Sequence, residues 1–140
     1  AATLAVVGVF LAGYAVANRG GSGPTPVLSQ ALKGTALAPQ AQGTLEVWDL
    51  RDGNWPMTLS VVGLKQLAPH RYYEVYLLRH GKPWGSCGTF RVEGPSTGVV
   101  TVTLTAPYTL KKGDSWVVTE PGAGGTEPGK TVLRPAPVTA

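Results

Sequence analysis

The side chains that could carry chemistry in this 140-residue chain stand singly. His70 and His80 each lie beside a predicted turn, next to an arginine, without a second ligand at metal spacing or a nearby carboxylate. Exposed loop histidines explain both residues better than a catalytic or metal site does. The single cysteine, Cys87, excludes an intramolecular disulfide and a Cys/His metal centre, and we expect it to be buried as a small apolar residue.

Carboxylates and glycine-rich segments predict no catalytic site either. Glu74 and Glu120 could approach each other in space, but their spacing does not establish a pair, and alternation makes Glu74 an outward-facing strand residue. Gly81-Lys82 lacks the preceding glycines and the following helix of a phosphate loop, and the serine-hydrolase elbow and zinc-protease motifs are missing. The sequence therefore predicts no catalytic residue, no metal ligand and no cofactor. We therefore expect that the protein is not an enzyme.

The charge of the chain does not favour nucleic acid as a partner. The formal net charge is +4, but the basic residues are scattered, and the only adjacent pair is Lys111-Lys112. Phosphate recognition requires clustered cations, because affinity comes from neutralising several phosphates together. A solvated surface with a mild basic excess explains the composition.

The elements that must position these residues are short strands. Apolar residues alternate with polar ones in brief runs, and turn residues such as those at 51–54 and 80–83 separate the runs. The predicted strands cover residues 27–32, 44–50, 56–62, 72–79, 84–92, 99–104, 116–119 and 131–133. We predict an all-β domain over residues 27–140, an antiparallel Ig-like β-sandwich of about seven strands.

An apolar segment without any charge occupies residues 1–17. Its length and composition predict a membrane-spanning helix, which we rank first. A cleaved signal peptide ranks second, because Ala15-Val-Ala17 before Asn18 resembles a signal-peptidase site. A pilin-like helix in a filament core ranks third.

Residues 18–26 are rich in Gly, Ser and Pro, and they predict a flexible juxtamembrane tether. Such an exposed backbone is open to proteases. The candidate protease-sensitive residues are Asn18, Arg19, Gly20, Gly21, Ser22 and Gly23.

Five short motifs follow one another in the predicted β domain. They are Gly-Leu-x-x-Leu-x-Pro at residues 63–69, a Tyr- and Leu-rich strand at 73–78, Gly81, Gly-Thr-Phe at 88–90, and Glu-Pro before a glycine-rich loop at 120–128. This order resembles the C-terminal extracytoplasmic domain of the anti-sigma-K factor family of bacterial membrane-bound anti-sigma factors, from about Ser29 to Leu133. The motif residues, to which the resemblance gives a structural role, are Gly63, Leu64, Tyr73, Tyr76, Gly88, Phe90, Glu120 and Pro121.

The resemblance implies a transcription regulator in the cell membrane, single-pass, with the β domain extracytoplasmic. Members of the family sequester a sigma factor with a cytoplasmic domain that has no counterpart in this chain, and membrane-associated proteases relieve the sequestration outside and then within the membrane. Tyr76 replaces a usual Trp, and Cys87 a usual small residue; we expect a core to tolerate both. The implied partners are membrane lipid, these proteases and, through the absent domain only, a sigma factor.

Two other functions compete with this interpretation. A pilin-like structural subunit would use the apolar segment for self-assembly into a surface filament. A secreted binding module for carbohydrate or cell wall would use exposed tryptophans among Trp48, Trp55 and Trp84, although packing against the sheet is the better explanation of their strand positions.

Overall fold

The computed structural model describes residues 24–94, 98–121 and 129–137, and in this part of the chain every regular element is a β-strand. The strands are β1 (Leu28–Gly34), β2 (Gln42–Val47), β3 (Trp55–Val62), β4 (Tyr73–Arg79), β5 (Lys82–Phe90), β6 (Val100–Ala106), β7 (Ser115–Thr119) and β8 (Thr131–Pro135). Each overlaps a strand expected from the sequence, so the all-β prediction is confirmed.

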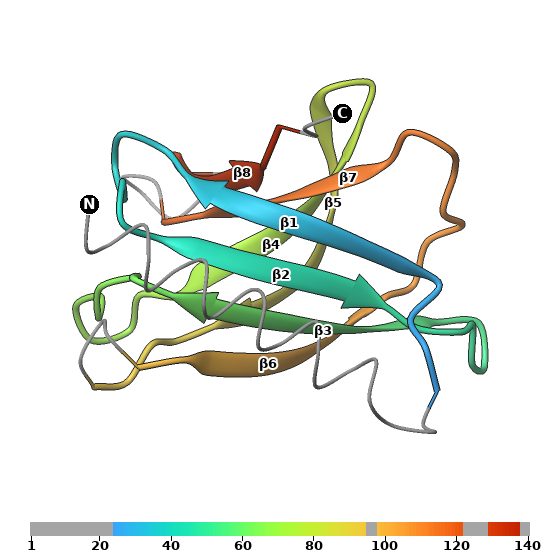
Figure 1. Ribbon diagram of the computed structural model, residues 1–140, viewed down its shortest axis with the longest axis horizontal. Helices are drawn as coiled ribbons and strands as arrows, with labels where there is room; N and C mark the ends of the chain where they lie inside the picture. Colours follow the sequence, from blue (N-terminus) through green and yellow to red (C-terminus); the bar gives the residue numbers. More distant parts are fainter. Residues whose placement is uncertain (1–23, 95–97, 122–128, 138–140) are drawn as a thin grey trace.

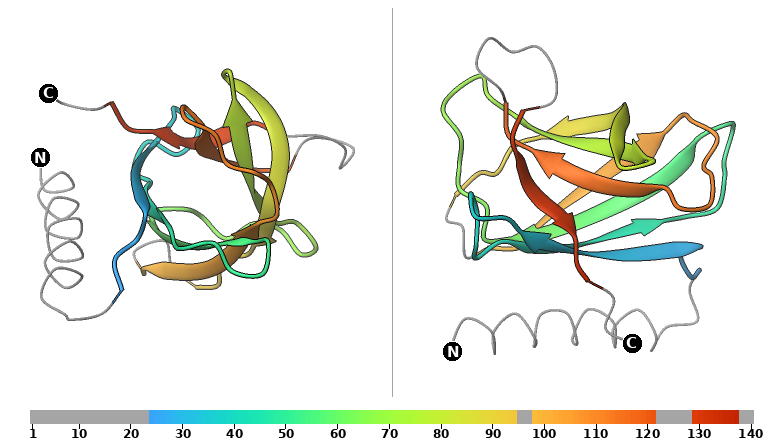
Figure 2. Two further views of the ribbon diagram at one scale, coloured as in Figure 1. Left: turned by 90° about the vertical axis from the view of Figure 1, so that its right-hand side faces the viewer. Right: turned by 90° about the horizontal axis from the view of Figure 1, so that it is seen from above.

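The arrangement of the strands differs from the predicted sandwich. All eight form one antiparallel sheet in the order β5-β4-β7-β8-β1-β2-β3-β6, instead of two sheets packed face to face (Figure 1). The sheet curls on itself until it is nearly closed like a barrel, as the left view of Figure 2 shows. The natural twist of a sheet of this size favours such curling. Alternation could not reveal it, because strands of sandwiches and of closed sheets both point every second side chain inward.

The interior of the curled sheet holds the core. Trp116 and Tyr73 are its largest fully buried side chains, each 1% exposed. Around them pack aliphatic residues of β2, β3, β4, β7 and β8, which include Leu45, Leu59, Leu77, Val118 and Leu133. Burial of this apolar surface is the main stabilising contribution in a domain without a disulfide.

Tyr108, in the connection after β6, bridges the gap between the two ends of the sheet. Its hydroxyl donates to the carbonyl of Ser86 in β5 at 2.6 Å, and its ring lies so close to Gly85 that a Cβ there would be 2.6 Å from Cζ. Trp84 meets the same ring edge-on, with centroids 5.0 Å apart. The β6–β7 connection therefore closes the sheet where no backbone ladder joins β5 to β6.

An ion pair holds the same connection to β4. Arg79 donates to both carboxylate oxygens of Asp114, at 3.0 and 2.8 Å, and also to the carbonyl of Thr109 at 2.8 Å. Asp114 also accepts from the backbone N–H of Lys111 at 2.7 Å. The guanidinium of Arg79 lies 4.3 Å from the ring centre of Trp84. The side chains of Arg79 and Asp114 are only 11% and 3% exposed, so water screens the pair weakly.

Replacement of Asp114 by asparagine is expected to lower the melting temperature at neutral pH. It should also make the melting temperature depend less on pH in the acid range. The hydrogen bonds from Arg79 lower the pKa of Asp114 below its ordinary value of 3.8. A lowered folded-state pKa contributes stability that is present above 3.8 and is lost as pH falls further. The difference between wild type and Asp114→Asn should therefore shrink below that pH in thermal scans. Glu93→Gln is the control, since Glu93 is 70% exposed in its pair with Arg91; an equal effect of both changes would contradict the prediction.

The two predicted hairpin turns are present. Asp52 and Gly53 have φ values of 49° and 79°, and His80 and Gly81 have values of 55° and 75°. Two consecutive positive φ values are the signature of the tight turn that matches the twist of antiparallel strands. His80 is exposed, as expected, and so is His70 in the β3–β4 connection.

The predicted apolar helix at residues 1–17 and the tether residues 18–23 lie outside the described residues. No helix that could span a membrane occurs among the described residues.

Candidate functional site

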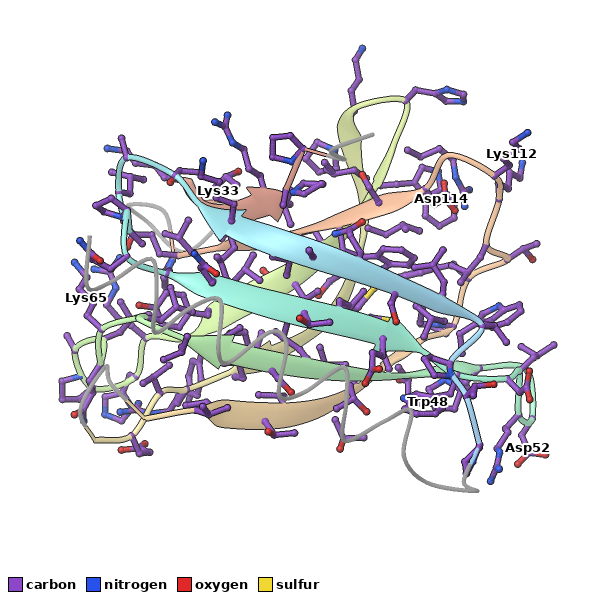
Figure 3. The ribbon with its side chains drawn as sticks, in the orientation of Figure 1. Lys33, Trp48, Asp52, Lys65, Lys112 and Asp114 are labelled. Carbon is purple, nitrogen blue, oxygen red and sulfur yellow. The ribbon has the colours of Figure 1, made fainter. Side chains whose placement is uncertain are left out.

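Most of the motif residues lie at one end of the curled sheet, where β3, β5 and β7 end and β4 begins. The side chains of Lys65, Gln66, Leu67, Ala68, Arg71 and Glu120 line a hollow of about 350 Å³ at this end, which we call the motif pocket. Lys65 marks its position at the left of Figure 3. The β3–β4 connection supplies all of its lining residues except Glu120, which follows β7.

Tyr73 connects several of the motif residues at this end of the sheet. Its hydroxyl donates to the carbonyl of Lys65 at 2.7 Å, and its ring stacks on Phe90 with centroids 5.4 Å apart. Burial of the phenol, and secondly the negative charge of Glu120, raise the pKa of Tyr73 to about 12. Tyr73 thus contacts two motifs, the β3–β4 connection and the Gly-Thr-Phe segment, and its pKa responds to the charge of Glu120 in a third.

Arg71 ties the wall of the pocket to the Glu-Pro segment. Its guanidinium donates to the carbonyl of Pro121 at 2.9 Å, and its backbone N–H donates to the carbonyl of Ala68 at 3.1 Å. The backbone N–H of Glu120 donates to the carbonyl of Lys130 at 3.0 Å and so fixes the end of β7 beside β8. The motif residues Glu120 and Pro121 are therefore held through their backbone groups.

Two motif glycines occupy positions that other residues would strain. Gly63 has a φ of 89°, and a Cβ there would lie 2.5 Å from the carbonyl oxygen of Gln40. Gly88 has a φ of 140°, and its Cβ would meet the side chain of Leu104 at 2.7 Å. Gly88 follows a bulge in β5, because Val75 pairs with Gly88 whereas Tyr76 pairs with Ser86. Cys87 is the extra residue of that bulge, and its side chain is buried as predicted.

Tyr76 lies on the other face of β4 from Tyr73. The expectation that it belongs to the core is wrong, because Tyr73, Val75 and Leu77 point inward and Tyr76 falls on the alternate, half-buried face of β4. Glu74 lies on that face too, where it accepts a hydrogen bond from Ser86 at 2.7 Å. The candidate tether residues 18–23 lie outside the described residues.

The motif pocket offers charged groups that suit ionic recognition. Lys65 and Arg71 contribute cations and Glu120 a carboxylate. Burial raises the pKa of the Cys87 thiol to about 11, so the thiol is protonated at neutral pH and unreactive. Among the residues that the structure describes, no group of three His, Cys, Asp or Glu side chains could hold a metal ion.

A second hollow, of about 290 Å³, lies at the opposite end of the sheet. Its lining residues are Pro24, Thr25, Trp48, Asp49, Arg51 and Pro56, and we call it the Pro24 pocket. Figure 3 places Trp48 at the right-hand end and Lys65 at the left-hand end. Sequence reasoning did not predict either pocket, because each combines segments that are far apart along the chain.

The tryptophans do not form a shared carbohydrate platform in the described structure. Trp116 is buried, Trp55 packs against the core, and Trp48 donates its indole N–H to Thr58 Oγ1 at 3.1 Å. Trp84 is 50% exposed, but Arg79 and Tyr108 already contact its ring. A sugar ring needs an open aromatic face, and this arrangement gives the binding-module interpretation little support.

The free energy of unfolding should decrease at alkaline pH as Tyr73 ionises, and replacement of Tyr73 by phenylalanine is expected to remove this part of the decrease. A raised folded-state pKa gives stability that is complete below the ordinary value of 10.0 and is lost as pH rises towards about 12. At neutral pH the variant should lose about 1 kcal/mol, because the hydrogen bond to Lys65 is gone. Urea unfolding from neutral pH to about pH 11 measures both effects.

The control for Tyr73→Phe is Tyr72→Phe, because Tyr72 is 45% exposed. Tyr72→Phe should leave the alkaline limb unchanged. If the free energy of unfolding decreased with alkaline pH as steeply in Tyr73→Phe as in wild type, the assigned role of Tyr73 would be contradicted.

Comparison with known proteins found no match to a family model, to a curated protein or to a solved structure. The functional interpretation therefore depends on the residues of this chain and on their arrangement.

Proposed function

We propose that this chain is the extracytoplasmic and membrane-anchor portion of a bacterial anti-sigma factor that resembles the anti-sigma-K family. The observation that supports the proposal best is that motifs separated in sequence meet at one end of the fold. Tyr73 stacks on Phe90 and bonds to the β3–β4 connection, and Arg71 of that connection bonds to Pro121. A shared structural unit accounts for the order of the motifs better than coincidence does.

The proposed mechanism divides the work between a stable domain and a cleavable tether. Strands whose backbone groups are paired on both sides resist proteases, because cleavage requires an extended, unpaired segment. Residues 18–23 follow the apolar run, and their Gly and Ser content favours such a segment. Cleavage there would leave a short stub for an intramembrane protease, and the cytoplasmic part would then release its sigma factor.

Determination of the coding sequence upstream of Ala1 tests this proposal. A helical cytoplasmic domain that precedes the apolar segment is the expected result. A short basic region followed directly by the apolar segment would identify a signal peptide and would exclude the anti-sigma function. A leader of the type that precedes pilins would favour the filament subunit instead.

A further inference from the structure

The end of the sheet that carries the Pro24 pocket exposes three aliphatic side chains. Leu50, between the strands of the β2–β3 hairpin, is 53% exposed, and Val27 and Leu28 at the start of β1 are 53% and 40% exposed. Val27 lies beside this hairpin, since its backbone N–H donates to Val47 at 2.8 Å. We call Val27, Leu28, Trp48 and Leu50 the apolar rim. Exposed aliphatic residues grouped at one end of a domain indicate an interaction surface.

The polar groups around the apolar rim suit a lipid headgroup layer. Trp48 is half-buried and lines the Pro24 pocket, and its indole N–H is held by Thr58 Oγ1. Arg51 and Asp49 line the same pocket, and Figure 3 shows Lys112 and Asp52 at this end too, so charges of both signs surround the apolar rim. Tryptophan with flanking Arg and Lys is the composition that proteins place at the membrane–water interface.

Chain connectivity brings this end, and not the other, to a bilayer. Pro24 and Thr25 line the pocket, and residues 18–23 join Pro24 to the apolar run that ends at Ala17. A fully extended chain between residues 17 and 24 spans at most about 25 Å. A run inserted in a membrane would therefore hold Pro24, which lines the pocket beside the apolar rim, within that distance of the lipid surface. This step rests on the membrane anchor of the proposed function.

We propose that the apolar rim docks on the surface of the phospholipid bilayer, with Leu50 and Val27 in the interfacial layer and Trp48 at the depth of the headgroups. The motif pocket, at the opposite end, then faces away from the membrane and is open to extracytoplasmic partners.

Fluorescence quenching by brominated lipids tests the docking. Residues 1–23 contain no tryptophan, so all tryptophan emission comes from the β domain. The full chain is reconstituted in vesicles of phosphatidylcholine and phosphatidylglycerol, with bromine near the headgroup end of the acyl chains. In a variant with Trp55→Phe and Trp84→Phe, emission comes from Trp48 and from Trp116, which is buried. We expect quenching in this variant, and we expect a further Trp48→Phe change to remove it.

Leu50→Asp should at least halve the quenching, because a carboxylate resists transfer from water to the interface. Leu37→Asp is the matched control: Leu37 is 50% exposed and lies in the β1–β2 connection, at the other end of the sheet. It should leave the quenching unchanged. Equal melting temperatures of the two variants ensure that folding is not the cause of a difference.

The outcomes separate docking from the proposed function. A chain that floats with the vesicles but shows no quenching of Trp48, or loses it equally in both aspartate variants, overturns the docking alone. A chain that fails to float overturns both the anchor and the docking. Quenching that depends on Leu50 supports the docking even where the upstream sequence excludes an anti-sigma factor.

Discussion

Replacement of Gly63 by alanine is expected to lower the free energy of unfolding by about 2–5 kcal/mol, since two costs add. The φ of 89° lies in the region that L-residues avoid, and the new Cβ would lie 2.5 Å from the carbonyl oxygen of Gln40. A backbone oxygen cannot move aside as a flexible side chain can. The substitution therefore tests whether the Gly-Leu motif is required by the fold.

Gly53→Ala is the matched control for Gly63→Ala. Gly53 has a similar φ of 79°, but nothing lies within 4 Å of the position its Cβ would take. Only the conformational cost remains, about 1–2 kcal/mol. Urea unfolding of both variants measures the difference, and equal losses would show that the contact with Gln40 contributes nothing.

Replacement of Trp116 by alanine is the second large expected effect, a loss of about 3–5 kcal/mol. Trp116 in β7 is 1% exposed and is the largest fully buried side chain described, so its removal leaves a cavity among the inward residues of several strands. The variant should also be digested faster by a nonspecific protease, because a smaller free energy of unfolding raises the population of open states.

Two companion variants show where the effect of Trp116→Ala comes from. Trp84→Ala removes a ring that is 50% exposed and should cost about 1 kcal/mol or less. Trp116→Phe should recover much of the loss, because a phenyl ring refills most of the cavity and the indole N–H has only the thiol of Cys87, a weak acceptor, beside it among the described residues. A cost for Trp84→Ala as large as that for Trp116→Ala would contradict the assignment of the core.

The sequence was most informative about local structure. The alternation of residues such as Leu45 and Val47 predicted β2, and Asp52-Gly53 predicted a hairpin, because both patterns reflect contacts between near neighbours. Closure of the sheet was not predictable, since it depends on Tyr108 reaching Ser86 across the gap between β5 and β6. Tyr108 stands in a connection without any periodic pattern.

In the candidate site, too, local motifs were recognisable in the sequence and long-range contacts were not. Tyr73 and Glu120 were singled out by motif, whereas Lys65 and Arg71, which complete the motif pocket, carried no signal in the sequence. Their roles arise from long-range contacts, such as that of Arg71 with Pro121. Tyr76 was misplaced because a bulge beside Cys87 and the direction of alternation decide its face, and a motif match encodes neither.

Capture of a sigma factor tests the central claim most directly. The whole encoded protein, with an affinity tag after Ala140, is isolated from detergent-solubilised membranes of its host, and the co-purifying proteins are identified by mass spectrometry. The account predicts one sigma factor bound to the intact protein and its loss once the β domain is cut away and intramembrane cleavage follows. Recovery of the intact, membrane-inserted protein without any sigma factor would contradict the account.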